Sequence, residues 1–122
     1  MMKDQKSKRY DLEDRTLEFG KRVLRLAKAL PKNQINLILS SQIIRSGTSI
    51  GANYREANET STKKDFLFRM RICKKEAKET HYWLCMIIEA NPNFEKRIKP
   101  LLQESVELVK IFASIVVKSS ET

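Results

Sequence analysis

Residues 66–88, which read FLFRMRICKKEAKETHYWLCMII, carry the pattern that decides the fold of this chain. Apolar or small side chains recur at alternating spacings of three and four, at Phe66, Met70, Cys73, Ala77, Thr80, Leu84 and Ile87. Such a stripe is typical of an amphipathic helix with one face on a core. The preceding run TST, residues 60–62, offers N-cap side chains, and Pro92 ends the pattern. The sequence therefore predicts a long helix between these two points.

The segment before this helix, residues 33–58, has an apolar pattern that is too wide for a single stripe. One face is described by Ile35, Leu39, Ile43, Ile50 and Tyr54, and a second by Leu37, Ile44 and Gly51. A helix in a monomeric bundle buries one arc of its surface, so the second arc favours contact with another subunit. A helix at the centre of a monomer is the alternative.

Two glycines in the same segment, Gly47 and Gly51, lie one turn apart, and each lowers helix propensity by about 1 kcal/mol. A close crossing with another helix would explain their presence. In the long helix that contains residues 66–88, the third of the chain, Leu67, Trp83 and Met86 lie off the main stripe and indicate a second buried surface. The predicted subunit interface therefore consists of Leu37, Ile44, Gly47, Gly51, Leu67 and Trp83.

Two further helices complete the pattern. Residues 11–30 carry one apolar stripe, have acidic residues at their start and are stopped by Pro31. A last helix starts around residues 92–94, or after Pro100, and continues to about Lys118. Four helices with short connections predict an all-α, up-down-up-down four-helix bundle. We expect it to span residues 10–118, between a flexible basic arm at residues 1–9 and a tail at residues 119–122.

The composition of the 122-residue chain agrees with one helical domain. Hydrophobic residues make up 41% and charged residues 32%, whereas three glycines and three prolines leave little material for the tight turns of an all-β fold. Lys and Arg number 24 against 15 Asp and Glu, which gives a formal net charge of +9. That charge favours polyanions or acidic surfaces as partners.

No segment of the sequence suggests a membrane span or a secretion signal. The longest apolar runs are about four residues, against the ~20 that a membrane span requires, and no apolar stretch follows the polar amino terminus. Cys73 and Cys85 share one predicted helix at a separation of roughly 18 Å, which is too far to bridge. We expect a cytoplasmic protein with no membrane partner, in which both cysteines are reduced and act as small hydrophobic residues.

The sequence offers little for catalysis or for a cofactor. His81 is the single histidine, so a Ser or Cys hydrolase is not favoured, although lysine-based variants stay open. Lys78 stands where a Glu-x-x-His metal motif needs its carboxylate. The sequence also lacks a phosphate-binding glycine loop and a dinucleotide fingerprint. We expect no enzyme activity, no metal and no cofactor.

Glu76 and Glu79 are two acids on a mostly apolar helix. They could act as a catalytic pair. Ion pairing with a basic residue, either Arg45 of the second helix or Lys75 on the same helix, accounts for them more simply. We expect a structural ion-pair cluster of Arg45, Glu76 and Glu79.

Basic residues gather at helical spacing in two places. On the third helix they are Arg71, Lys74, Lys75 and Lys78, and on the first helix they are Lys21, Arg25 and Lys28. Such ridges suit phosphate backbones, whereas the alternative is a solvated helix face. Neither group interleaves with aromatic residues, so sequence-specific reading of single strands is not predicted. The basic arm from Lys3 to Arg9 would add contacts.

Four ordered, ungapped motifs resemble a known bacterial family. They are R-S-x-x-S-I-x-A-N at residues 45–53, R-E-A at 55–57, K-K-D-F at 63–66 and K-E-A-x-E-x-x-Y-W-L at 75–84. This combination resembles the four-helix-bundle family encoded in intervening sequences of 23S ribosomal RNA genes. The resemblance extends from about Tyr10 to Lys118.

The resemblance implies a left-handed up-and-down bundle that assembles as a homopentamer with a central opening. The fold is also similar to that of the accessory protein of diversity-generating retroelements, a basic pentamer that associates with a reverse transcriptase and nucleic acid. The sequence shows no local feature that is peculiar to these retroelement accessory proteins. The resemblance implies no enzymatic activity and no catalytic residues.

Charge placement and the family's setting in ribosomal RNA genes favour a non-enzymatic, homo-oligomeric protein that binds RNA or DNA phosphates through its basic helix faces. The alternative is a protein-interaction scaffold that docks a nucleic-acid enzyme such as a reverse transcriptase. In that alternative the positive charge serves only to steer the partners together.

Overall fold

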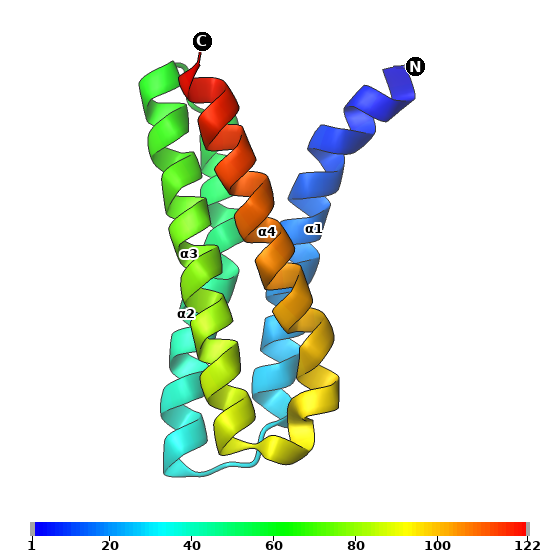
Figure 1. The fold of residues 1–122 in the computed structure, drawn as a ribbon, viewed down its shortest axis with the longest axis vertical. Coiled ribbons are helices and arrows are strands. Elements are labelled where there is room, and N and C mark those ends of the chain that lie inside the picture. Colours follow the sequence, from blue (N-terminus) through cyan, green and yellow to red (C-terminus); the bar gives the residue numbers. More distant parts are fainter. Residues whose placement is uncertain (1, 122) are drawn as a thin grey trace.

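The computed structural model describes the backbone of residues 2–121 and the side chains of residues 12–121. Its elements are α1 (Met2–Ala29), α2 (Gln34–Asn58), α3 (Lys63–Ala90), a short 3₁₀ turn η1 (Pro92–Phe94) and α4 (Glu95–Ser120). The predicted all-α fold with four long helices is confirmed, and residues 2–121 contain no strand (Figure 1). The predicted basic arm, Lys3 to Arg9, lies outside the residues whose side chains are described.

The helix boundaries follow local signals in the sequence. Asn33 caps α2, because its side-chain oxygen accepts the Asn36 backbone N–H at 2.8 Å. Thr62 caps α3 in the same way by accepting the Asp65 N–H at 3.1 Å, which confirms the predicted start of this helix. α4 begins directly after η1 and continues through Pro100, so the earlier of the two predicted starts is correct.

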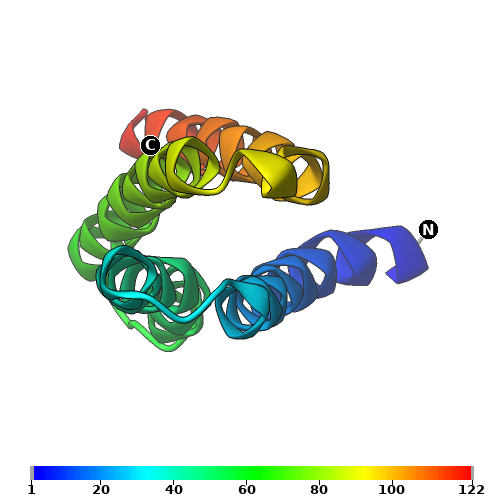
Figure 2. The same cartoon turned by 90° about the horizontal axis from the view of Figure 1, so that it is seen from below.

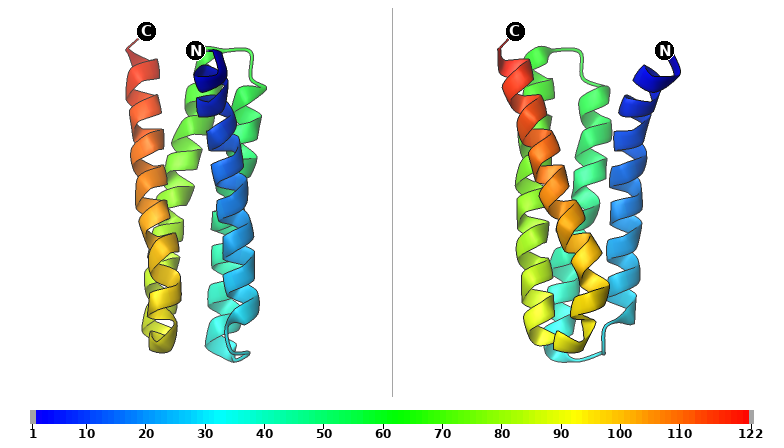
Figure 3. Two further views of the ribbon diagram at one scale, coloured as in Figure 1. Left: turned by 90° about the vertical axis from the view of Figure 1, so that its right-hand side faces the viewer. Right: turned by 45° about the vertical axis from the view of Figure 1, so that its right-hand side comes forward.

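The helices form an open arrangement. α2 packs along α3 and α3 along α4, whereas α1 packs on α2 and makes only sparse contact with α4. Seen along the helices, α1 and α4 lie at the two ends of an arc (Figure 2). The α1–α2 and α3–α4 connections lie at one end of the molecule, and the α2–α3 connection lies at the other (Figures 1 and 3).

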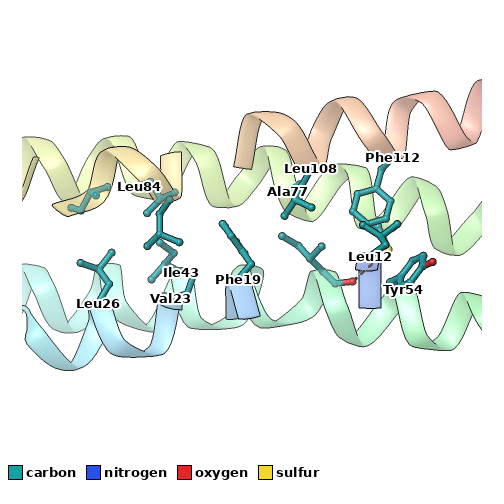
Figure 4. Close-up of a cluster of buried hydrophobic side chains, with 14 of the residues drawn as sticks. Leu12, Phe19, Val23, Leu26, Ile43, Tyr54, Ala77, Leu84, Leu108 and Phe112 are labelled. Atoms are coloured by element: carbon teal, nitrogen blue, oxygen red, sulfur yellow. Dashed lines mark hydrogen bonds between the residues drawn. The ribbon is translucent and has the colours of Figure 1, made fainter. Parts of the chain in front are cut away.

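A continuous apolar core runs inside this arc. All four helices contribute fully buried side chains, among them Phe19 of α1, Ile43 of α2, Leu84 of α3 and Phe112 of α4 (Figure 4). The predicted stripe of α3 is buried from Met70 to Ile87. The predicted core face of α2 is correct except at Ile35, which belongs to the first turn and is 62% exposed. The apolar core face of α2 therefore begins at Leu39.

A buried pair of amides ties the loops together at one end of the bundle. The side chains of Asn36 and Asn91 each donate to the other's oxygen at 2.9 Å. Their second donors reach the carbonyls of Pro31 and Ile87. Because every hydrogen-bonding group of the pair has a partner, the burial of these two polar side chains leaves no donor or acceptor unsatisfied.

The close crossing expected around the helical glycines lies between α1 and α2 of the same subunit. A Cβ atom on Gly47 would stand 2.9 Å from Val23 Cγ2, and one on Gly51 would stand 3.2 Å from Thr16 Oγ1. Gly47 is buried by this contact, so assigning it to the subunit interface was wrong. The glycines allow two backbones in one chain to approach closely, and Gly51 keeps only part of its surface open.

Candidate nucleic-acid interface

Three of the four basic residues predicted on α3 form a line of exposed cations. Arg71, Lys75 and Lys78 are exposed, and we call these three residues the α3 ridge; Lys74 is half-buried beside it. Between residues 12 and 121, no hydrogen bond or ion pair engages any of the four side chains. From Arg71 to Lys78 the helix rises about 10 Å, so the three cations follow one side of α3 over two turns.

The basic residues predicted on α1 are divided among three places. Lys21 and Lys28 lie along the side of α1 that faces α2, in neighbouring surface depressions. Arg25 lines a hollow toward α4, and its Nη1 is 3.0 Å from Glu18 Oε2 on α1 itself. The first-helix group therefore does not form a single free ridge comparable with that of α3.

Two arginines that the sequence pattern did not single out join Arg25. Arg22 of α1 and Arg97 of α4 line, with Arg25, a hollow of about 180 Å³ between the two helices. Arg97 is distant from the others in sequence, and only the packing of α4 beside α1 brings it near them. Periodicity within one helix carries no signal for such a cluster.

The predicted ion-pair cluster is confirmed. The Arg45 guanidinium bonds to Glu79, and its Nη1 lies 3.3 Å from Glu76 Oε1, whose side chain is almost fully buried. The Trp83 indole N–H also donates to Glu79 at 3.0 Å. Of the two predicted partners, Arg45 of α2 forms the ion pairs with Glu76 and Glu79, and Lys75 of α3 does not. Glu76 and Glu79 thereby hold α2 against α3.

The predicted subunit-interface residues lie on two separate surfaces. Leu37, which is 69% exposed, and Ile44 line an apolar groove of about 530 Å³ between α1 and α2. We call it the α1–α2 groove; its other apolar walls are Leu24, Ala27, Leu30 and Pro31. Leu67 and Trp83 are half-buried on α3. Their role between subunits stays a prediction.

The described part of the chain shows no arrangement typical of a metal centre. Among residues 12–121, no group of three or more His, Cys, Asp or Glu side chains is placed to hold an ion. His81 Nδ1 lies 3.9 Å from Cys85 Sγ on the next turn of α3. None of the described helices combines the length and apolar character that crossing a membrane requires.

The two cysteines are expected to differ sharply in reactivity. Cys73 is fully buried, and desolvation raises its pKa to about 12, so it stays a neutral thiol at pH 8, whereas Cys85 is partly exposed. Iodoacetamide at pH 8 should therefore label Cys85 in the folded protein and both residues in urea, as measured by peptide mass spectrometry. Cys85→Ser should remove native labelling, and Cys73→Ser should leave it unchanged. Native labelling at Cys73 would contradict the burial of this thiol.

The fold and the surface define a class: a small, basic, four-helix protein that displays a line of exposed cations on one helix. Within that class the comparison is specific. The chain belongs to the family of 23S rRNA-intervening sequence proteins, whose model matches residues 8–114. The resemblance carried by the sequence motifs is thereby confirmed.

A solved structure supports this assignment. The chain is similar to a protein of unknown function from the S23 ribosomal protein family of Bacteroides thetaiotaomicron, with 39% sequence identity and a TM-score of 0.78. The match covers 85% of this chain and 96% of that one. No protein with curated information matches the chain.

Proposed function

We propose that this protein is a non-enzymatic, homo-oligomeric nucleic-acid-binding protein that holds RNA or DNA by its phosphates. The observation that carries the proposal is the α3 ridge. Three exposed cations follow one side of α3 and have no carboxylate partner among residues 12–121, whereas Arg15, Arg25 and Arg45 are all engaged in ion pairs. Free cations in a row suit a polyanion, because each can exchange its counterions for a phosphate.

The proposal includes self-association. The α1–α2 groove leaves Leu24 and Leu37 exposed beside half-buried Ile44, and contact with a second copy would remove this apolar surface from water. The family resemblance implies a left-handed, up-and-down bundle that forms a pentamer. In such an assembly each copy adds its own α3 ridge, which would strengthen binding to a long polyanion.

Nucleic-acid binding is tested most directly with the unmodified protein. We expect fluorescence polarisation to show binding to an RNA fragment and to duplex DNA at low salt. The logarithm of the association constant should fall linearly with the logarithm of salt concentration, because binding releases counterions. A protein that binds neither nucleic acid at low salt would contradict the proposal.

Self-association is expected to depend on the α1–α2 groove. Sedimentation velocity at micromolar concentration should show an oligomer for the wild type and a shift toward monomer for Leu37→Glu, since a buried carboxylate without a partner is costly. Ile35→Glu is a matched control, because Ile35 is similarly exposed on the same helix but does not line the groove. A wild-type protein that sediments as a monomer would contradict this part of the proposal.

A second candidate function is a scaffold that docks a nucleic-acid enzyme such as a reverse transcriptase. The extent of the α1–α2 groove favours it, because an apolar surface of this kind could receive a helix of a protein partner. Charge reversal at Lys74 and Lys75 separates the two functions. It should abolish RNA retention in both cases but leave capture of the enzyme intact only for the scaffold.

A further inference from the structure

Two aromatic side chains on α3 are exposed without an evident structural reason. Phe68 is 59% exposed and Tyr82 is 54% exposed. The other aromatic residues between positions 12 and 121 are buried or partly buried in the core, including Phe19, Tyr54 and Phe112. A single exposed apolar side chain is common on protein surfaces, so the meaning of these two rings depends on which residues stand beside them on α3.

These rings stand at the two ends of the α3 ridge. The order along the helix is Phe68, Arg71, Lys75, Lys78 and Tyr82, with spacings of three, four, three and four. Residues at this spacing share one face of a helix, and all five are exposed. At 1.5 Å per residue, about 21 Å separates the two rings along the helix axis. No aromatic residue interleaves with the three cations, but one flanks them at each end.

A chain of contacts from α2 supports the position of Tyr82. Its ring meets that of Trp83 nearly perpendicularly, with centroids 5.1 Å apart and an interplanar angle of 77°. Trp83 is in turn held by its hydrogen bond to Glu79, which bonds to Arg45. Such support limits the movement of the Tyr82 side chain and reduces the entropy that it would lose on binding.

We propose that this face of α3 binds single-stranded nucleic acid, with bases stacked on Phe68 and Tyr82 and the phosphates between them held by the α3 ridge. The inference rests on the proposed function and specifies its ligand. A row of cations with an exposed ring at each end suits a single strand, because its unpaired bases expose the faces that a duplex hides by stacking. Stacking is tolerant of sequence, so the site selects strandedness rather than base identity.

The test compares aromatic with aliphatic side chains at the two positions. One double variant, Phe68→Leu with Tyr82→Leu, keeps apolar bulk but removes both rings. Its matched control, Phe68→Trp with Tyr82→Phe, keeps a ring at each site. Fluorescence polarisation should be measured with a single-stranded oligopyrimidine RNA, an abasic strand of the same length and a blunt RNA duplex. Sedimentation velocity should be run on every variant.

We expect the leucine variant to bind the single strand at least about tenfold more weakly, given the size of base–aromatic stacking in other proteins. Its affinity for the duplex should change by less than about twofold. The slope of the salt dependence should be unchanged, because no cation is removed. The ring-containing control should retain wild-type affinity, and the abasic strand should bind the wild type and the leucine variant equally.

The outcomes separate this inference from the function on which it rests. If the wild type binds no nucleic acid at low salt, the proposed function itself fails. If it binds and the leucine variant loses nothing, or loses equally on the duplex, the stacking site is overturned and phosphate binding stands. If the leucine variant sediments differently from the wild type, the two rings belong to a protein interface and the inference is also overturned.

Discussion

Changing Arg71, Lys75 and Lys78 together to glutamate is expected to weaken binding of RNA and DNA at low salt by at least about 100-fold. The three side chains have no competing ion pair in the described chain, so their full charge is available to phosphates. Reversal replaces attraction with repulsion along the whole α3 ridge. Fluorescence polarisation at several salt concentrations measures both the loss of affinity and the change in salt dependence.

A second triple variant separates local contact from overall charge. Lys96, Lys110 and Lys118 are exposed on α4, and their change to glutamate also removes two units of charge per substitution. Each triple variant therefore lowers the formal net charge from +9 to +3. The α4 variant should bind much more tightly than the ridge variant. Equal losses would show that the field of the whole molecule, and not the α3 ridge, governs binding.

Replacing Phe19 by alanine is expected to lower the free energy of unfolding by about 3–5 kcal/mol. Phe19 is fully buried, and it anchors α1, the helix with sparse contact to α4 (Figure 4). Removing the ring takes away apolar contact and leaves a cavity in a core that is covered from fewer sides than a closed bundle. Because domains of this kind are stable by about 5–15 kcal/mol, the loss is a large fraction of the total.

Urea denaturation followed by circular dichroism measures this effect. Leu17→Ala is a matched control, because Leu17 lies on the same helix, two residues away, and is 42% exposed. It should cost less than about 1 kcal/mol, as is usual for surface positions. Similar losses for the two variants would mean that Phe19 does not anchor α1 in the way that its burial indicates.

The assembly bears on both functional candidates. The groove that would join copies lies between α1 and α2, whereas the α3 ridge lies on a helix that packs against α2 and α4. Self-association through the groove would therefore leave the ridge of each copy open to a ligand. A monomeric Leu37→Glu variant with an intact ridge would show how much of the binding depends on having several ridges in one particle.

Much of the fold follows from local patterns in the sequence. Spacings of three and four predicted the buried face of α3, because a helix places such residues on one side whatever lies opposite. Thr62 and Pro31 marked helix ends because capping and proline geometry act within a few residues. The presence of a cation beside Glu76 and Glu79 also followed, since acids on an apolar helix face need one, but the structure decided that Arg45 and not Lys75 provides it.

Other features were decided only by the tertiary structure. Periodicity shows that a face of a helix is apolar, small or charged, but not which element covers it. Gly47 therefore looked like a contact for another subunit until its partner proved to be Val23 of α1. Arg97 joined Arg22 and Arg25 only through the packing of α4. Phe68 and Tyr82 became a candidate site because their exposure depends on how α2 and α4 cover α3, and such long-range contacts leave no local trace in the chain.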